Sequence, residues 1–324
     1  MSGGHILALC GGVGGAKLAF GLTKILPPDR LTIAVNTGDD FEHLGFSISP
    51  DLDTVAYTLA DLSDRVRGWG LAGETWQFMD ALRRLGGEDW FLLGDKDLAI
   101  HVERTRRRFA GETLSEVTTA LARRLGLAHA IVPMSDQPVR TVVDTDEGPL
   151  AFQHYFVREQ CRPVVRAVRY EGAGQARPSA AFAAALARSD LAAIVICPSN
   201  PYLSIAPILA VPGVREALAA RGAPCVAVSP IIGGEAVKGP SAKMMRELGV
   251  EASPVTVARY YAGLIDGLVL DTLDAEHAAT IEALGVATSV TQTLMRGDDD
   301  RIALAQDSLA LAEALAGRRL AKAG

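Results

Sequence analysis

The feature that most constrains the fold is a short apolar run that passes at once into glycines and then into a helix. Residues 6–9 read Ile-Leu-Ala-Leu, and the apolar side chains over 18–26 recur at helical spacing until a Pro-Pro pair stops them. The positions between hold four glycines, namely Gly11, Gly12, Gly14 and Gly15. A buried strand, a bare turn and a helix in this order predict the first unit of an α/β sheet.

The same alternation returns in the second half of the chain. Apolar runs at 192–197, 225–228 and 268–270 have the length of buried strands, and a helical pattern follows each of them. Repeated strand and helix of this kind implies parallel strands covered on both faces. We therefore predict a Rossmann-like, largely parallel sheet with helices on both faces, formed by residues 1–64 and 179–324.

Residues 65–178 depart from this alternation. Helical patterns over 76–85 and 113–125, the second begun by a Thr-x-x-Glu capping box, are followed by extended pieces joined by short turns. We predict that this segment is an inserted, mixed α/β subdomain that caps the core and contributes to substrate binding. The basic run 104–108 is expected to form a solvated helix face.

Composition excludes several classes of protein. The 324 residues are 49% hydrophobic and 22% charged, as in ordinary globular proteins of one or two domains. The net charge of −6 argues against a chain that wraps nucleic acid. There is no signal peptide pattern, and no apolar run approaches the roughly 20 residues needed to cross a bilayer. The four cysteines are widely spaced, as expected of reduced thiols. We predict a cytoplasmic protein without nucleic-acid or membrane partners.

The most acidic stretch follows the second apolar run, residues 31–35. Asp39 and Asp40 lie behind a glycine, and Asp51 and Asp53 lie in the first turn of a helix that a Ser-Pro pair begins. Adjacent carboxylates repel, so a cation or a hydrogen-bonded ligand explains the first pair better than a solvated turn. The helix dipole alone also explains acids in a first turn. Because Mg²⁺ takes carboxylate oxygens, and ligands bind outside the carboxyl ends of parallel strands, we predict Mg²⁺ at Asp39, Asp40 and Asp51.

Three turns at strand ends offer groups that bind phosphate or a nucleotide. The first glycine turn opens a helix, where bare amides and the dipole bind anions, and a later Gly-Gly turn precedes two lysines and a second helix start. A Ser-Asn pair between prolines could contact a base or a ribose. Turns that simply need glycine or proline, and solvated lysines, explain the same residues without a ligand. The candidate residues are Gly11, Gly12, Gly14, Gly15, Lys17, Ser199, Asn200, Gly233, Gly234, Lys238 and Lys243.

Nine segments between residues 6 and 271 resemble, in order and spacing, the family of 2-phospho-L-lactate transferases, CofD. They are LCGGVGGAK, VNTGDDFEHLG, SPDLDTV, GWGLAGE, WFLLGDKDLA, PMSDQPVRT, FQHYFV, PSNPYLSI and VSPIIGGEAVKGPSAK. The resemblance implies a Rossmann-like fold, a homodimer and an Mg²⁺-dependent transferase of coenzyme F-420 biosynthesis. The implied reaction moves a phosphorylated three-carbon acid from a guanosine-diphosphate-linked donor to the ribityl hydroxyl of 7,8-didemethyl-8-hydroxy-5-deazariboflavin and releases GMP.

The resemblance also assigns residues. Asp51 matches the family's deazaflavin-binding aspartate, and Lys96 stands at a second acceptor position where Arg is expected in many members. Lys is a point charge and Arg a bidentate fork, so the contact there differs. The residues expected to bind the deazaflavin are Asp51, Asp53, Lys96, Ser135 and Asp136. Asp39, Asp40 and Asp51 are expected to act in catalysis, by holding Mg²⁺ and orienting the hydroxyl.

Two other functions stay open. A regulatory, nucleotide-sugar-binding protein like the YvcK group shares the glycine loop and the aspartate pair, but the segments SPDLDTV and LGDKDLA favour the transferase. A nucleotide hydrolase would release GMP without an acceptor. No motif distinguishes lactate, enolpyruvate and glycerate as the three-carbon acid.

Overall fold

In the computed structural model, which describes residues 3–323, the core is a seven-stranded sheet in which all neighbouring strands are parallel. The strand order is β14-β13-β10-β9-β1-β2-β5. The strands are β1 (His5–Cys10), β2 (Leu31–Val35), β5 (Ala130–Pro133), β9 (Leu191–Ile196), β10 (Cys225–Val228), β13 (Gly267–Asp271) and β14 (Ala287–Thr291). The predicted Rossmann-like α/β class is confirmed.

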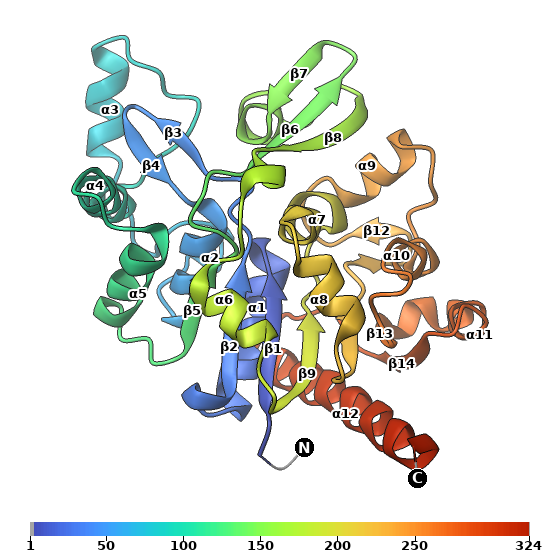
Figure 1. Ribbon diagram of the computed structural model, residues 1–324. Coiled ribbons are helices and arrows are strands. Elements are labelled where there is room, and N and C mark those ends of the chain that lie inside the picture. Colours follow the sequence, from blue (N-terminus) through green and yellow to red (C-terminus); the bar gives the residue numbers. More distant parts are fainter. Residues whose placement is uncertain (1–2, 324) are drawn as a thin grey trace.

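Side chains of each strand alternate between two layers of helices, as the pleat requires. In β1, Leu7 and Leu9 face one layer, whereas Ile6 and Ala8 face the other. The first layer comprises α6 (Ala180–Leu186), α7 (Ala206–Ala210), α8 (Val214–Ala220), α10 (Pro254–Tyr260) and α11 (Ala278–Glu282). The second comprises α1 (Gly12–Ile25), α2 (Pro50–Leu59), α5 (Leu114–Arg124) and the long α12 (Asp298–Ala323), seen at the bottom of Figure 1.

The sheet grows in two directions from β1. The chain adds β2 and β5 on one side, then returns to add β9, β10, β13 and β14 on the other. In open α/β sheets the ligand crevice lies outside the carboxyl ends of the strands at this switch point. Leu9 of β1 lies opposite Ala34 and Ile196, so the loops after β1, β2 and β9 leave the sheet at the same level. These are the glycine turn, the acidic stretch and the Ser-Asn turn.

Two smaller units stand over this edge of the sheet (Figure 1). The hairpin β3 (Phe41–His43)–β4 (Phe46–Ile48) packs with α3 (Gln77–Arg84) and α4 (Asp95–Phe109). The second unit is an antiparallel sheet of three strands, β6 (Arg140–Thr145), β7 (Gly148–Ala151) and β8 (Val165–Glu171), beside α9 (Ser241–Glu247).

Two observations differ from the sequence-based expectations. Strand β5 and helix α5 fall inside the range 65–178 but belong to the main sheet and its helical layer, so this part of the range is core. Strand β14 was not predicted, because it is a half-exposed edge strand whose sequence Ala-Thr-Ser-Val-Thr lacks an apolar run.

No single helix within residues 3–323 has the length and apolar content needed to cross a membrane. One sharply bent pair, Pro201–Ala210 with Val214–Ala220, meets these criteria by length and composition alone.

Candidate active site

Asn36, at the end of β2, holds two carboxylates together. Its side-chain amide nitrogen donates to Asp39 Oδ1 at 2.5 Å and to Asp51 Oδ2 at 2.9 Å, and it also lies 3.2 Å from the carbonyl oxygen of Leu203. Its own oxygen accepts a hydrogen bond from the amide of Gly38 and so fixes the turn. The end of β2 and the first turn of α2 therefore meet. We call Asn36, Asp39, Asp40 and Asp51 the Asn36 group.

No ion pair neutralises Asp39 or Asp51 in the described part of the chain. Burial raises the pKa of Asp39 well above its ordinary value, and the charge of Asp51 raises it further. Burial raises the pKa of Asp51 to about 6, against the hydrogen bonds from Asn36 and Gly12. Buried carboxylates without a cation are energetically costly. A cation bound here would offset this cost.

Asp40 follows Asp39 in the chain and raises its pKa slightly, but the charges that act on Asp40 itself are those of Arg140, Arg104 and Asp53. The Ser49 hydroxyl donates to its Oδ2 at 2.9 Å, so Ser49 begins α2 without capping it through its side chain. Burial raises the pKa of Asp40 to about 7, although the charge of Arg140 opposes this shift. Asp40 Oδ1, Thr37 Oγ1 and Thr141 Oγ1 are buried and have no hydrogen-bond partner in residues 3–323. Carboxylate and hydroxyl oxygens without partners are of the kind that Mg²⁺ takes as ligands.

The glycine turn contacts the Asn36 group directly. The amide of Gly12, in the first turn of α1, donates to Asp51 Oδ1 at 2.8 Å. Ser199 holds the same turn from the other side, because its hydroxyl accepts from the Gly11 amide at 3.1 Å and donates to the Gly11 carbonyl at 2.8 Å. A Cβ atom on Gly11 would lie 2.6 Å from Asp51 Oδ2, so only glycine fits there.

The other predicted glycines and Asn200 have structural tasks. Cβ atoms on Gly14 and Gly15 would lie 2.4 Å from the Pro198 carbonyl oxygen and 2.5 Å from the Ser199 hydroxyl oxygen. Asn200 Oδ1 accepts from the amides of Tyr202 and Leu203 and caps the helical turn Pro201–Ile205. Packing therefore explains Gly14 and Gly15, whereas Nδ2 of Asn200 is buried without a hydrogen-bond partner in residues 3–323.

The Gly-Gly turn after β10 is a two-residue hairpin between β11 (Ile231–Ile232) and β12 (Glu235–Ala236). Gly233 and Gly234 both have positive φ, 57° and 79°, which the mirror-image turns of tight hairpins require. The Gly233 amide donates to the Asp274 carboxylate, so it is already satisfied.

The three predicted lysines divide into two places. Lys17 and Lys238 line one pocket beside the first turns of α1. Lys243 lies on α9, where its ammonium donates to Glu247 and to the carbonyl of Pro163. The pocket also contains Arg65, Arg296 and Arg301, which the sequence did not reveal because they belong to no motif.

A second polar group joins α2 to α4, and we call it the helix seam. It consists of Asp53 and Tyr57 on α2 and of Asp97, His101 and Arg104 on α4. Arg104 is 3% exposed and pairs with Asp53, so the expectation that 104–108 is a solvated face is wrong for Arg104. Asp97, His101 and Arg104 are spaced for one face of α4, and that face packs on α2.

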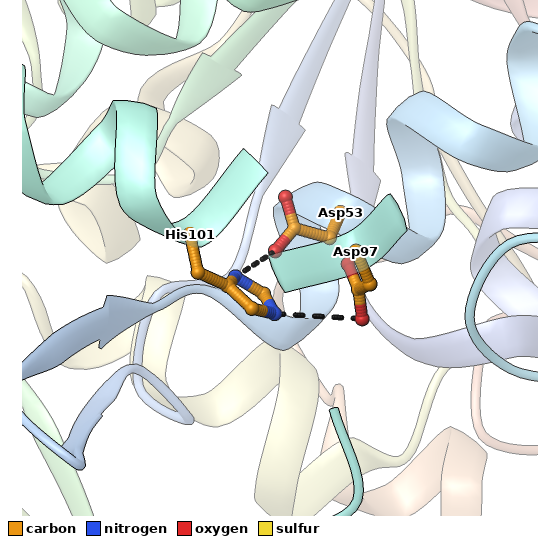
Figure 2. A group of neighbouring side chains, drawn as sticks. All are labelled: Asp53, Asp97 and His101. Atoms are coloured by element: carbon orange, nitrogen blue, oxygen red, sulfur yellow. Dashed lines mark ion pairs between the residues drawn. The ribbon is translucent and has the colours of Figure 1, made fainter. Parts of the chain in front are cut away.

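Figure 2 shows His101 between the two carboxylates of the seam. Its Nδ1 lies 3.7 Å from Asp53 Oδ2 and its Nε2 lies 3.4 Å from Asp97 Oδ2. The ligand atoms of these three residues all lie within 4.8 Å of one another, a spacing that suits a metal ion. The carboxylates, however, approach opposite ring nitrogens, and Arg104 already provides the buried positive charge. The chain thus provides a countercharge in the seam, whereas Asp39 and Asp51 of the Asn36 group form no ion pair in residues 3–323.

The remaining predicted acceptor residues are Lys96 on α4 and Ser135 and Asp136 in the loop after β5. Lys96, in the first turn of α4, donates to the carbonyl of Ala72 at 3.0 Å. Asp136 Oδ1 accepts from the amide of Ser115 at the start of α5. Ser135 is fully buried, and its hydroxyl accepts from the amide of Gln137. These contacts hold Ser135 and Asp136 in place within the loop after β5.

Comparison with known proteins identifies the family. The model of the family described as 2-phospho-L-lactate transferase CofD matches residues 6–302. The chain belongs to the CofD family. It is 44% identical over 316 residues to a phosphoenolpyruvate transferase of Kitasatospora aureofaciens, with 95% of this chain and 98% of the relative covered. It is 39% identical over 301 residues to a 2-phospho-L-lactate transferase of Methanosarcina mazei, with 93% and 98% covered. The chain is thus a member of a transferase enzyme family.

The solved structures agree on the fold. A crystal structure of protein BH3568 from Bacillus halodurans aligns with a TM-score of 0.61 at 17% identity, covering 94% of this CofD-family chain and 99% of that protein. A second structure of the same protein, described as a member of the UPF0052 family, gives the same TM-score. At this identity the similarity concerns the fold alone.

Proposed function

We propose that this CofD-family protein transfers a phosphorylated three-carbon acid from a guanosine-diphosphate-linked donor to the ribityl hydroxyl of 7,8-didemethyl-8-hydroxy-5-deazariboflavin, with release of GMP, in coenzyme F-420 biosynthesis. The observation that carries the proposal is the contact between the Asn36 group and the amide of Gly12. At the switch point of the sheet, the carboxylate of Asp51 thus lies against the start of α1, and helix starts of this kind bind anions.

Phosphoryl-type transfer needs positioning and charge neutralisation more than covalent help from the protein. Asp39, Asp40 and Asp51 would hold Mg²⁺, which when bound neutralises the charge that develops on the transferred group. Asp51 sits between the amides of Asn36 and Gly12, so its carboxylate is fixed in direction. That rigidity suits a residue that orients the acceptor hydroxyl. A homodimer and a cytoplasmic location stay predictions.

The names of the relatives leave the three-carbon acid open, because both phosphoenolpyruvate and 2-phospho-L-lactate transferases align over nearly the whole chain. The decisive experiment offers the purified protein the deazaflavin, Mg²⁺ and, in turn, the guanylated lactate, enolpyruvate and glycerate donors, and identifies the products by mass spectrometry. We expect one donor to give the phosphodiester product with stoichiometric GMP. GMP release without acceptor would indicate a hydrolase, and binding of UDP-sugars but not of deazaflavin would indicate the regulatory alternative.

A further inference from the structure

The two smaller units over the carboxyl edge of the sheet start from the same place (Figure 1). The first unit, built of β3, β4, α3 and α4, begins with Phe41, directly after Asp40. The second unit, built of β6, β7 and β8, begins where the amide of Thr141 donates to the carbonyl of Gly38 at 2.7 Å. Both units are therefore rooted in the acidic stretch that carries the Asn36 group.

The two units meet again at Trp90, in the segment 86–94 between α3 and α4. The indole of Trp90 lies edge-to-face with two imidazole rings, with centroids 4.6 Å from His154 and 5.0 Å from His43. His43 belongs to β3 of the first unit, and His154 begins the helical turn His154–Arg158 that follows β7 of the second. Of the aromatic ring contacts within residues 3–323, only that of Trp90 with His154 joins the two units. We call this contact the Trp90 bridge.

The neighbours of His154 show that its ring is turned away from the core of its own unit. Phe152 and Tyr155 are buried and pack with side chains of β6 and β8. His154 lies between them in the sequence but contacts Trp90 instead. The two units thus touch both at the acidic stretch and at the Trp90 bridge.

The Trp90 bridge leaves polar atoms without partners. Nε1 of Trp90 and Nε2 of His43 are both buried and have no hydrogen-bond partner in residues 3–323. A buried polar atom of this kind destabilises a fold by about as much as one aromatic pair stabilises it. Because opening the bridge would let water reach both nitrogens, the open and closed arrangements are close in free energy.

The segment that carries Trp90 is lightly anchored. Glu88, Asp89 and Leu92 are exposed. Asp89 pairs with Arg83 at 2.8 Å, but both side chains of this pair are nearly half exposed, at 49% and 43%. Exposed segments with few buried contacts open locally, and loops of this kind close the active sites of many enzymes.

We propose that the Trp90 bridge is a latch between the two units, which opens to admit the acceptor to the Asn36 group and closes to exclude water during transfer. This inference rests on the proposed function and adds the control of its competing reaction. In transfer, the ribityl hydroxyl attacks the phosphorus of the phosphorylated acid, and GMP leaves. With the latch open, water attacks the same phosphorus, and GMP leaves together with the free phosphorylated acid. A closed latch therefore couples the release of GMP to formation of the product.

The test measures GMP and phosphodiester product in one reaction that contains the full-length protein, Mg²⁺, the deazaflavin and the donor that supports transfer. The wild type should release one GMP for each product molecule. Trp90→Ala and His154→Ala should raise this ratio by about two- to tenfold, the effect of losing one aromatic pair. His154→Phe keeps a ring and should keep the ratio of the wild type.

Leu92→Ala is the matched control, because Leu92 is exposed on the same segment and takes no part in these ring contacts. Its ratio should equal that of the wild type. A wild-type ratio in both Trp90→Ala and His154→Ala would overturn the role of the latch in excluding water.

A second measurement detects the opening without the reaction. Protein labelled with 5-fluorotryptophan gives three indole signals in ¹⁹F NMR, and Trp90→Phe identifies the one from Trp90. Relaxation dispersion should show exchange between two positions for this signal, and His154→Ala should abolish the exchange by leaving only the released position. Absence of exchange at Trp90 in the wild type overturns the latch. Exchange at Trp90 without transfer from any donor leaves the latch assigned and refutes the proposed reaction.

Discussion

Two neighbouring groups of buried aspartates in this protein differ in how their negative charge is compensated. In the helix seam, Asp53 and Asp97 are buried with Arg104 and His101, so the chain provides its own countercharge. In the Asn36 group, Asp39 and Asp51 have amide donors but no cationic partner among the residues that the structure describes. Asp51 and Asp53 are only two residues apart on α2, yet their partners differ completely.

The difference shows that acidic clustering alone does not identify a metal site. Among the described residues, the only group of three His, Cys, Asp or Glu ligand atoms that all lie within 4.8 Å of one another is in the seam, but Arg104 already occupies the place of a cation there. The pKa values separate only Asp97 from the Asn36 group, because burial also raises the pKa of Asp53, although the charges of Arg104 and His101 oppose this shift. Burial would raise the pKa of Asp97, but the hydrogen bond and charge of His101, with Tyr57 and Arg104, lower it below its ordinary value. The pKa of Asp51 stays raised, at about 6.

The largest expected effect is on the rate of transfer, with no loss of stability. Asp51→Ala should reduce transfer on the order of 10³-fold, because in the proposed function it removes both a metal ligand and the group that orients the hydroxyl. Without metal, the variant should be at least as stable as the wild type, since the substitution relieves the repulsion between Asp39 and Asp51. Steady-state rates and urea denaturation measure the two quantities. Near-normal turnover, or a large loss of stability, would remove the distinction between the two groups.

The next effect is on stability. Arg104→Met should lower the free energy of unfolding by about 3–5 kcal/mol, because it leaves Asp53 buried without its cation. The double variant Asp53→Asn with Arg104→Met should recover part of this loss. Arg106→Met, on the same helix but exposed and paired with the partly exposed Glu103, should cost at most about 1 kcal/mol. Equal denaturation midpoints for the Arg104 and Arg106 variants would show that the seam is not a buried ion pair.

A third prediction concerns pH. The pKa values of Asp40, about 7, and Asp51, about 6, are higher in the folded protein than in the unfolded chain. Their contribution to stability is therefore present below pH 4 and is lost as the pH rises through 6 to 7. The pKa of Asp97 is lowered in the folded protein, so this residue stabilises the fold at pH values above its pKa in the unfolded chain. This stabilisation is lost only in acid.

Urea denaturation in EDTA should accordingly show stability falling between pH 5 and pH 8. Saturating Mg²⁺ should flatten this slope, because the ion favours the deprotonated carboxylates. The Asp40→Asn variant should show a flatter pH dependence of stability even in the absence of metal. A slope that is the same with and without Mg²⁺, and unchanged in Asp40→Asn, would contradict the assignment of the ion to the Asn36 group.

The smallest effect is expected at Lys96, next to Asp97 of the seam. Lys96→Arg should tighten deazaflavin binding by about twofold, since Arg offers a bidentate fork where Lys offers a point charge. Lys96→Met should weaken it by more than that. Fluorescence titration of the acceptor measures both, and equal affinities for all three proteins would exclude Lys96 from the acceptor site.

The sequence predicted the sheet well where strands are buried on both faces. Strands β1, β2, β9 and β10 are almost continuous apolar runs, so their existence and their order relative to the helices were visible. Edge strand β14 was not visible in the sequence, because its residues are only partly buried and form no apolar run. The contact of the acidic stretch with the glycine turn followed from the rule that ligands gather at carboxyl ends of strands.

Partners distant in sequence could not be predicted. Arg104 and Asp53 are 51 residues apart, and a run of arginines on a helix gives no sign that one of them points inward. The Gly-Gly pair at 233–234 looked like a phosphate loop, but its positive φ angles serve a tight hairpin. Arg296 reaches the pocket with Lys17 only through the path of the chain from β14 into α12.

Asn36 has a consequence for how easily an ion enters. Its amide nitrogen carries two hydrogens but lies within reach of three acceptors, on Asp39, Asp51 and Leu203. One acceptor is therefore always left over. When a divalent ion takes a carboxylate oxygen, the two hydrogens still find two oxygens, so loading the site leaves no donor stranded.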